Sequence, residues 1–113
     1  MSSVVAKRLV SPVQLGISIS TLYTATNVRA TLDKVTGTNT TGGAVTATLH
    51  IVPAAGSASA TNMIIQARSI GAGSTEAFPE MVGHVLEPGE TLQALASAAA
   101  SIGVRVSGRE VSQ

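Results

Sequence analysis

Residues 44–52 carry the stretch AVTATLHIV, in which apolar and polar side chains alternate cleanly. Val45, Ala47, Leu49 and Ile51 would lie on one face of an extended chain, with two threonines and a histidine on the other. Side chains of a β-strand point to opposite faces in turn, so a period of two over this length predicts a half-buried strand.

A second alternating stretch precedes the first. In residues 28–36 the apolar Val28, Ala30 and Leu32 alternate with polar side chains. Between the two stretches lies TGTNTTGG (36–43), whose three glycines favour a turn. The pattern predicts a hairpin in which residues 28–36 pair with residues 44–52.

Short extended segments separated by Gly, Pro and Ser continue to the end of the chain. Pro53 ends the strand at 44–52, and a small-residue loop (54–61) follows. Residues 62–70 are partly apolar on both faces, which is typical of a more central strand. The EPGE sequence at 87–90 has Pro at the second and Gly at the third position, as a type II turn favours. Further strands are expected at residues 75–78, 81–86, 91–97 and 102–111.

Two segments allow alternatives. Residues 93–100 (QALASAAA) have helical propensity, but a helix there would be barely two turns long, so we interpret them as strand plus loop. Residues 1–20 contain strand-like stretches interrupted by Pro12 and Gly16, which indicates an N-terminal arm or a first strand.

Seven or eight short strands separated by turns predict an all-β fold. We expect a single antiparallel β-sandwich, of jelly-roll or immunoglobulin-like topology. The arm or first strand would occupy residues 1–20 and the sandwich domain residues 21–113.

The composition excludes several functional classes. The chain has seven Lys and Arg against six Asp and Glu, and its two aromatic residues are one Tyr and one Phe. Dispersed cations and missing stacking platforms argue against a nucleic-acid partner. The sequence contains no cysteine and no run of apolar residues long enough for a membrane helix, so we expect no disulfide and no membrane partner.

Charged residues make up only 12% of the chain. A freely diffusing small domain usually keeps about 25–35% of its surface charged. One explanation is a surface covered by other subunits, because the cores of interfaces are depleted in charge. The alternative is a monomer whose surface is coated with Ser and Thr.

Few residues suit catalysis or metal binding. His50 and His84 lie in separate predicted strands and form no i,i+2 or i,i+4 pair, and Asp33 is the only aspartate. We interpret both histidines as structural; a small hydrolase using either is a minor alternative. No catalytic, cofactor-binding or metal-binding residue is predicted, and we expect no enzyme and no cofactor. A loose acidic cluster consists of Glu76, Glu80, Glu87 and Glu90.

Four basic residues are candidates for contacts with a neighbouring chain. Arg105 and Arg109 share one side of the last strand, and arginine suits bidentate contacts with carboxylates. The alternative is an ordinary solvated face. Lys7 and Arg8 lie in the N-terminal segment, where they would bridge to an adjacent subunit or keep a free end soluble.

Six strings carry a resemblance through their order and spacing: LYT (22–24), TNTTGGAVTATLHIVP (38–53), GSASATN (56–62), IGAGST (70–75), VLEPGETLQA (85–94) and VRVSGREV (104–111). Together they cover roughly residues 21–111 and resemble small virion structural proteins of tailed bacteriophages. The sequence departs from that pattern at ATNV (25–28), where those chains often continue with Val-Pro and a turn. No binding residue of the family can therefore be carried over.

The resemblance implies a non-enzymatic β-sandwich located in the virion. Such proteins serve as head decoration, head–tail collar, spike-base or tail components, usually as homo-oligomers docked on capsid, portal/collar or tail proteins. The alternative function is a carbohydrate or host-receptor binding module on a phage or cell surface. Its site would be formed at one end of the sandwich by loops 37–43, 54–61 and 97–101.

Overall fold

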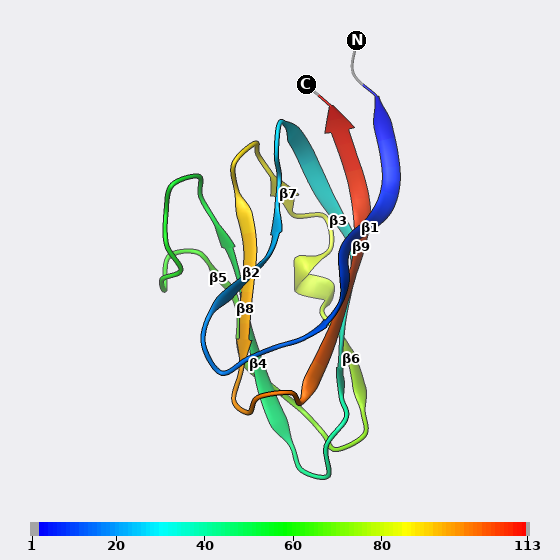
Figure 1. The fold of residues 1–113 in the computed structure, drawn as a ribbon, viewed down its shortest axis with the longest axis vertical. Helices are drawn as coiled ribbons and strands as arrows, with labels where there is room; N and C mark the ends of the chain where they lie inside the picture. The colour runs from blue at the N-terminus through cyan, green and yellow to red at the C-terminus, as the bar shows by residue number, and fades with distance from the viewer. Residues whose placement is uncertain (1–2, 113) are drawn as a thin grey trace.

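The alternating segments form two antiparallel sheets that face each other, as the computed structural model of the chain shows in Figure 1. The structure describes residues 3–112, except for the side chains of residues 11 and 12. Its elements are β1 (Val4–Gln14), β2 (Ser20–Thr24), β3 (Val28–Asn39), β4 (Val45–Val52), β5 (Met63–Ile70), β6 (Thr75–Ala77), the single-turn 3-10 helix η1 (Pro79–Met81), β7 (Val85–Leu86), β8 (Thr91–Ala96) and β9 (Ile102–Ser112). Within the described residues, no helix has the length and apolar character to cross a membrane.

The strand order identifies the topology. One sheet has the order β1-β9-β3-β6, with the short β7 also paired to β3, and the other has the order β2-β8-β4-β5. Pairing β1 with β9, β2 with β8, β3 with β6 and β4 with β5 gives the double Greek key of a jelly roll. The predicted all-β sandwich is confirmed, and of its two candidate topologies the structure has the jelly roll.

The core lies between the sheets and is filled mainly by aliphatic side chains. Phe78, the one phenylalanine, is fully buried beside Met81. Gly37 makes room for this ring, because a Cβ at that position would lie 3.1 Å from Phe78 and 3.2 Å from Ile102. The largest fully buried aliphatic side chains are Leu15, Leu32, Leu49, Ile70, Leu86, Leu92 and Ile102.

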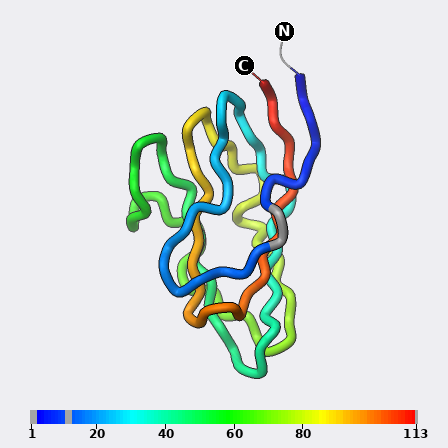
Figure 2. The backbone as a smooth tube through the Cα atoms, viewed as in Figure 1, coloured from blue at the N-terminus to red at the C-terminus, as the bar shows by residue number. Residues whose placement is uncertain are grey.

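The predicted hairpin between residues 28–36 and 44–52 is wrong. β3 and β4 lie in different sheets, and the segment between them crosses from one sheet to the other (Figure 2). The fully buried Asn39 holds this crossing, since its Nδ2 donates to the carbonyls of Gly43 (2.8 Å) and Ile70 (2.9 Å). A glycine-rich turn fits a crossing between layers as well as a hairpin, so the local sequence does not distinguish the two.

The expected central position of the strand at 62–70 is also wrong, because β5 is the edge of its sheet. Ile65 and Ile70 both face the core although they are an odd number of residues apart. The change of phase occurs near Ala67, whose φ is +46°, where the pairing with β4 shifts register. A second register shift with β4 falls at Ile64, and the two bulges together place apolar side chains on both faces of the strand.

One turn and one strand predicted between residues 81 and 90 have different outcomes in the structure. Residues 87–90 form the predicted turn, with φ of +91° at Gly89 and the Glu90 N–H donating to the Glu87 carbonyl at 2.9 Å. The strand predicted at 81–86 is mostly absent, because Pro79 begins η1, whose Met81 enters the core. β7 covers only the last two residues of that range.

The N-terminal segment lies along the sheet. β1 pairs with β9 from Val4 opposite Val111 to Gln14 opposite Gly103, with two shifts of register. Its other edge has no neighbour in the strand order of the described chain. The chain then crosses to the other sheet, and both termini of the described chain lie at the same end (Figure 1).

Candidate functional site

Most of the charged side chains are paired within the chain. Four of the seven cations make ion pairs in the described structure: Lys7–Glu110 (3.2 Å), Arg29–Glu87 (3.0 Å), Arg68–Glu80 and Arg109–Asp33 (3.0 Å). Each joins side chains from different elements or from an element and a turn. Exposed pairs of this kind contribute about 0–1 kcal/mol to stability. Their main consequence here is which charged side chains remain without an ion-pair partner.

Lys7 and Arg109, two of the four predicted interface residues, belong to these pairs. Arg109 donates from Nε and Nη2 to the carboxylate of Asp33 at 3.0–3.2 Å, between the neighbouring strands β9 and β3. Lys7 on β1 donates to Glu110 on β9. Both cations have carboxylate partners in their own chain.

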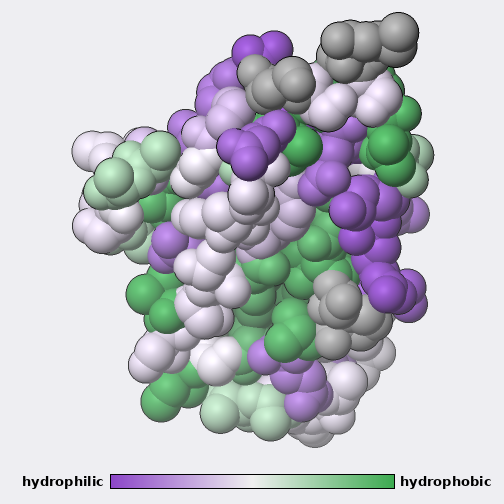
Figure 3. All heavy atoms as spheres, turned by 45° about the horizontal axis from the view of Figure 1, so that its top comes forward, coloured by the Kyte–Doolittle hydropathy of each residue, from purple (hydrophilic) through white to green (hydrophobic). Residues whose placement is uncertain are grey.

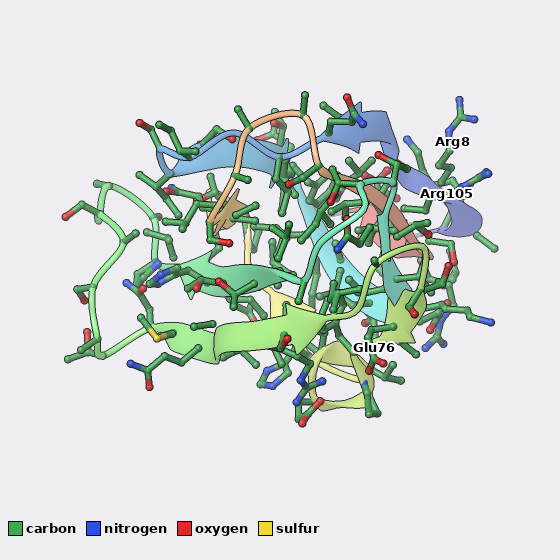
Figure 4. All side chains as sticks on the ribbon, turned by 90° about the horizontal axis from the view of Figure 1, so that it is seen from below. Arg8, Glu76 and Arg105 are labelled. Atoms are coloured by element: carbon green, nitrogen blue, oxygen red, sulfur yellow. The ribbon has the colours of Figure 1, made fainter. Side chains whose placement is uncertain are left out.

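Arg8 and Arg105, the other two predicted interface residues, line one groove on the outer face of the β1-β9-β3-β6 sheet. We call this hollow of about 220 Å³ the outer groove, and Figure 4 shows both arginines projecting from the same side of the sheet. A second hollow of about 370 Å³ adjoins it through Arg105 and continues to Val13 and Gln14. The outer groove is lined by Arg8, Lys34, Thr36, Arg105, Val106 and Ser107.

Strand register explains why these cations meet. Ser107 on β9 lies opposite Arg8 on one side and Lys34 on the other, while Arg105 lies opposite Thr36. Residues paired across a sheet share a face, so three strands place three positive charges together.

Lys34 is not among the interface residues predicted from the sequence. The buried positions of β3 change from Ala30 and Leu32 to Val35, leaving Asp33 and Lys34 exposed together at a register shift opposite β9. This change of phase is visible in the sequence and is the signal that could have placed Lys34 on the outer face.

A second polar cluster connects the two sheets. Tyr23 on β2 donates its hydroxyl hydrogen bond to Glu110 on β9, which also accepts from Lys7. The hydrogen bond from Tyr23 lowers the pKa of the Glu110 carboxyl, against the effect of its desolvation, and Lys7 lowers it further. Burial and the same carboxylate raise the pKa of Tyr23 well above its ordinary value.

The histidines lie in different surroundings. His50 is buried, and its Nδ1 is 2.8 Å from Oδ1 of Asn62. Asn62 also accepts from the Ser59 N–H and donates to the Ser57 carbonyl, which holds the loop between β4 and β5 over this histidine. His84 is exposed. Within the described residues, no group of three or more His, Asp or Glu side chains is arranged to hold a metal ion.

The four glutamates of the predicted acidic cluster are held by different partners. Glu80 and Glu87 make ion pairs, and Glu90 accepts a hydrogen bond from the Glu87 N–H at 2.8 Å. Among the described side chains, Glu76 is the one carboxylate that has neither an ion pair nor a hydrogen bond. It lies exposed on β6.

The three loops expected to form a binding surface do not lie together. Loops 37–43 and 97–101 meet at one end of the sandwich, where the Thr40 N–H donates to the Ser101 carbonyl at 2.9 Å. Loop 54–61 lies at the opposite end, where Ala54 packs beside Gly89. Strand β4 (Val45–Val52) connects loop 37–43 to loop 54–61, so the strand predicted at 44–52 already implies that these two loops lie at opposite ends of the sandwich.

The fold is similar to those of two kinds of solved structure, whereas no protein-family model and no curated protein matches the chain. A chain of infectious bursal disease virus, Gx strain, superposes with a TM-score of 0.55 at 14% identity, over 98% of this chain and 32% of that one. The corresponding Gt-strain match has a TM-score of 0.50 at 14% identity, over 100% and 33% of the two chains. This chain therefore spans about a third of the length of the virus chains.

The other structure comes from Bacillus endospore appendages, described as a family of disulfide-linked pili. It superposes with a TM-score of 0.55 at 15% identity, over 97% of this chain and 88% of that one. At such low identities the similarity concerns the fold alone. This protein is thus a jelly-roll sandwich with distant structural similarity to a viral chain and to an endospore-appendage chain.

Proposed function

We propose that this chain is a non-enzymatic structural subunit of a bacteriophage virion, which assembles with itself and docks on larger virion proteins. Its place would be in head decoration, at the head–tail collar or spike base, or in the tail. The phage setting is supported by the six sequence strings quoted above. The assembling role has independent support from the surface of the molecule.

The observation that carries the proposal is the surface left after the internal ion pairs have formed. Among the described side chains, three cations and two carboxylates make no ion pair, while large aliphatic side chains project outward. Figure 3 shows hydrophobic residues gathered in the middle of one face, with hydrophilic ones along its right-hand edge. The exposed large hydrophobic residues are Val4, Val5, Val13, Ile17, Ile19, Val82 and Val85. Burial against a neighbour would remove this apolar area from water.

The open edge of β1 adds a second reason. β1 is an eleven-residue edge strand, and Val4 and Val5 on it are 62% and 51% exposed. An open strand edge presents unpaired backbone N–H and C=O groups that can pair with another chain. Lys7 and Arg8 also lie on this strand, so charge limits indiscriminate pairing there.

The structural neighbours are consistent with an assembling subunit. One belongs to a virus and the other to pili. Because this sequence contains no cysteine, its subunits would be held by non-covalent contacts instead of disulfides. Fold similarity alone does not determine function, so this support is secondary to that of the surface.

Light scattering coupled to size-exclusion chromatography tests self-assembly. We expect a molar mass several times that of the 11.3 kDa chain, increasing with loading concentration. A constant monomer mass across the concentration series would overturn the proposal.

The virion setting has its own test. Phage particles purified from a host carrying the gene should contain the chain by mass spectrometry after density-gradient separation. If the protein assembles but never copurifies with particles, the assembling role stands and the phage placement is wrong.

A further inference from the structure

We propose that the outer groove binds the Glu76 carboxylate of a second copy of this chain. The inference rests on the proposed self-assembly and names one contact that would join the subunits. It depends on the charges that remain once every internal ion pair has formed.

The groove collects the cations that lack a carboxylate partner. Among the described side chains, Arg8, Lys34 and Arg105 are the three without an ion pair, and all three line the outer groove. Like charges gathered on neighbouring strands repel one another, and a bound carboxylate would relieve that repulsion. Arginine guanidinium groups bind a carboxylate through two parallel hydrogen bonds. The hydroxyls of Thr36 and Ser107 add neutral donors to the same groove.

Glu76 is the complementary group. It is exposed on β6, a three-residue strand at the end of the sheet order, and has no ion pair or hydrogen bond in the described structure. The pKa of the Arg68 guanidinium is raised chiefly by its hydrogen bond to Glu80, and the charge of Glu76 raises it to a smaller extent. The neighbours Thr75 and Ala77 are small, so β6 can approach another surface closely.

Glu76 and its own groove lie on opposite faces of one sheet. Glu76 pairs with Gly37, whose missing side chain would point at Phe78 in the core. Arg105 pairs with the adjacent Thr36 and projects outward. Figure 4 shows Glu76 away from Arg8 and Arg105, on the other side of the ribbon. Glu76 therefore does not reach the groove of its own chain, and the carboxylate proposed to bind there would come from another copy.

Such a contact joins two different patches and repeats from copy to copy. A heterologous contact of this type closes into a ring or continues as a filament, depending on the rotation between subunits. Either product is an assembly of the kind that the proposed function requires. The adjoining hollow beside Val13 and Gln14 would receive the residues that flank the inserted carboxylate.

Charge reversal on each side tests the contact. We expect the groove variant Arg8→Glu/Arg105→Glu and the variant Glu76→Arg each to weaken self-association about tenfold or more, measured by sedimentation velocity. Mixing the two variants should restore assembly, because each then offers a carboxylate to a cationic groove or an arginine to an acidic one. The control Arg29→Glu/Arg109→Glu changes the net charge equally outside the groove; it breaks two exposed ion pairs of the chain but changes none of the groove residues, and once shown to be folded it should assemble like the wild type. Circular dichroism checks that every variant is folded.

The outcomes separate this contact from the proposed function. A wild-type protein that stays monomeric overturns both. Wild-type assembly that neither variant weakens, or that mixing does not restore, overturns the contact and leaves the assembling role intact. Loss of assembly in the groove variant alone overturns the choice of Glu76 and indicates another anion as the occupant, and competition by inorganic phosphate would identify that case.

Discussion

Gly108 is the point where β9 leaves no space for a side chain. A Cβ there would collide with the carbonyl oxygen of Thr31 and would lie 2.8 Å from Leu9 Cδ1. The first of these atoms belongs to the backbone of the neighbouring strand, so the clash can be relieved only by moving strands apart. Glycine at this position therefore sets the distance between β9 and β3 beside the register shift in β3.

Gly108→Ala should lower the free energy of unfolding by about 3 kcal/mol, at the upper end of typical overpacking costs. Urea denaturation followed by circular dichroism measures the change. Gly103→Ala is the matched control, because it lies on the same strand and a Cβ added there would have nothing within 4 Å. Its stability should change by less than about 1 kcal/mol. Equal urea midpoints for the two variants would show that the strands can move to accommodate the Cβ of residue 108 without loss of stability.

A second prediction at the scale of single residues concerns the hydroxyl of Tyr23. Tyr23→Phe removes the hydroxyl that donates to Glu110 and should cost about 1 kcal/mol near neutral pH, because one hydrogen bond between the sheets is lost. Thermal unfolding of the two proteins in the same buffer measures this difference. Unchanged stability in Tyr23→Phe would show that this hydrogen bond does not stabilise the fold.

The same pair predicts a pH dependence. The pKa of Glu110 is lowered on folding, so its stabilisation is present above the ordinary carboxyl pKa and is lost as the pH falls through the folded value. The pKa of Tyr23 is raised, so its contribution is complete below about pH 10 and is lost as the pH rises further. Wild type should therefore lose more stability than Tyr23→Phe in both acid and strong alkali. Parallel curves of stability against pH would contradict the coupling.

At the scale of elements, the crossing from β3 to β4 depends on one buried amide. Asn39 donates to the Gly43 and Ile70 carbonyls, and its Oδ1 accepts from the N–H and hydroxyl of Thr41. The local sequence predicts a hairpin here because it contains the right turn residues. The amide contacts a carbonyl of β5, a strand far along the chain, and no periodicity reveals that contact.

Asn39→Ala should destabilise the fold by about 2–3 kcal/mol, since it leaves buried backbone carbonyls without donors. Chemical denaturation gives the size of the loss. Thr75→Ala is the comparison variant: its hydroxyl makes an exposed hydrogen bond of 2.9 Å with Thr38, and we expect a smaller cost of less than about 1 kcal/mol. If Thr75→Ala proved the more damaging change, the crossing would not be the critical element.

Bulges explain two of the differences between sequence expectation and structure. In β5 the two-sided apolar pattern predicts a central strand, whereas the change of phase near Ala67 marks a bulge in an edge strand. In β3 the change of phase between Leu32 and Val35 places Lys34 beside Arg105. Period-two reasoning is reliable between bulges and fails across them, because one extra residue reverses every later side chain.

At the scale of the whole molecule, the open edge of β1 should take part in assembly. Val5→Lys adds charge to a half-exposed valine on that edge and should weaken self-association about tenfold, roughly the loss of one buried valine. Folding should change little, because exposed substitutions usually alter stability by less than about 0.5 kcal/mol. Ala60→Lys adds the same charge to an exposed loop and serves as the control. Sedimentation velocity showing equal association of both variants would remove β1 from the interface.

The sequence by itself determined the all-β class, most strand positions, the 87–90 turn and the sparsity of charge. These features depend on residues near one another in the chain. Of the four interface cations predicted from the sequence, Arg8 and Arg105 line the outer groove. Only the tertiary structure decided that the strands form a jelly roll, that Lys7 and Arg109 are neutralised internally, and that Lys34 joins the groove. Strand order and ion pairing depend on contacts between residues far apart in the sequence. Alternative strand orders differ little in local free energy, and only the packing of the whole core selects one of them.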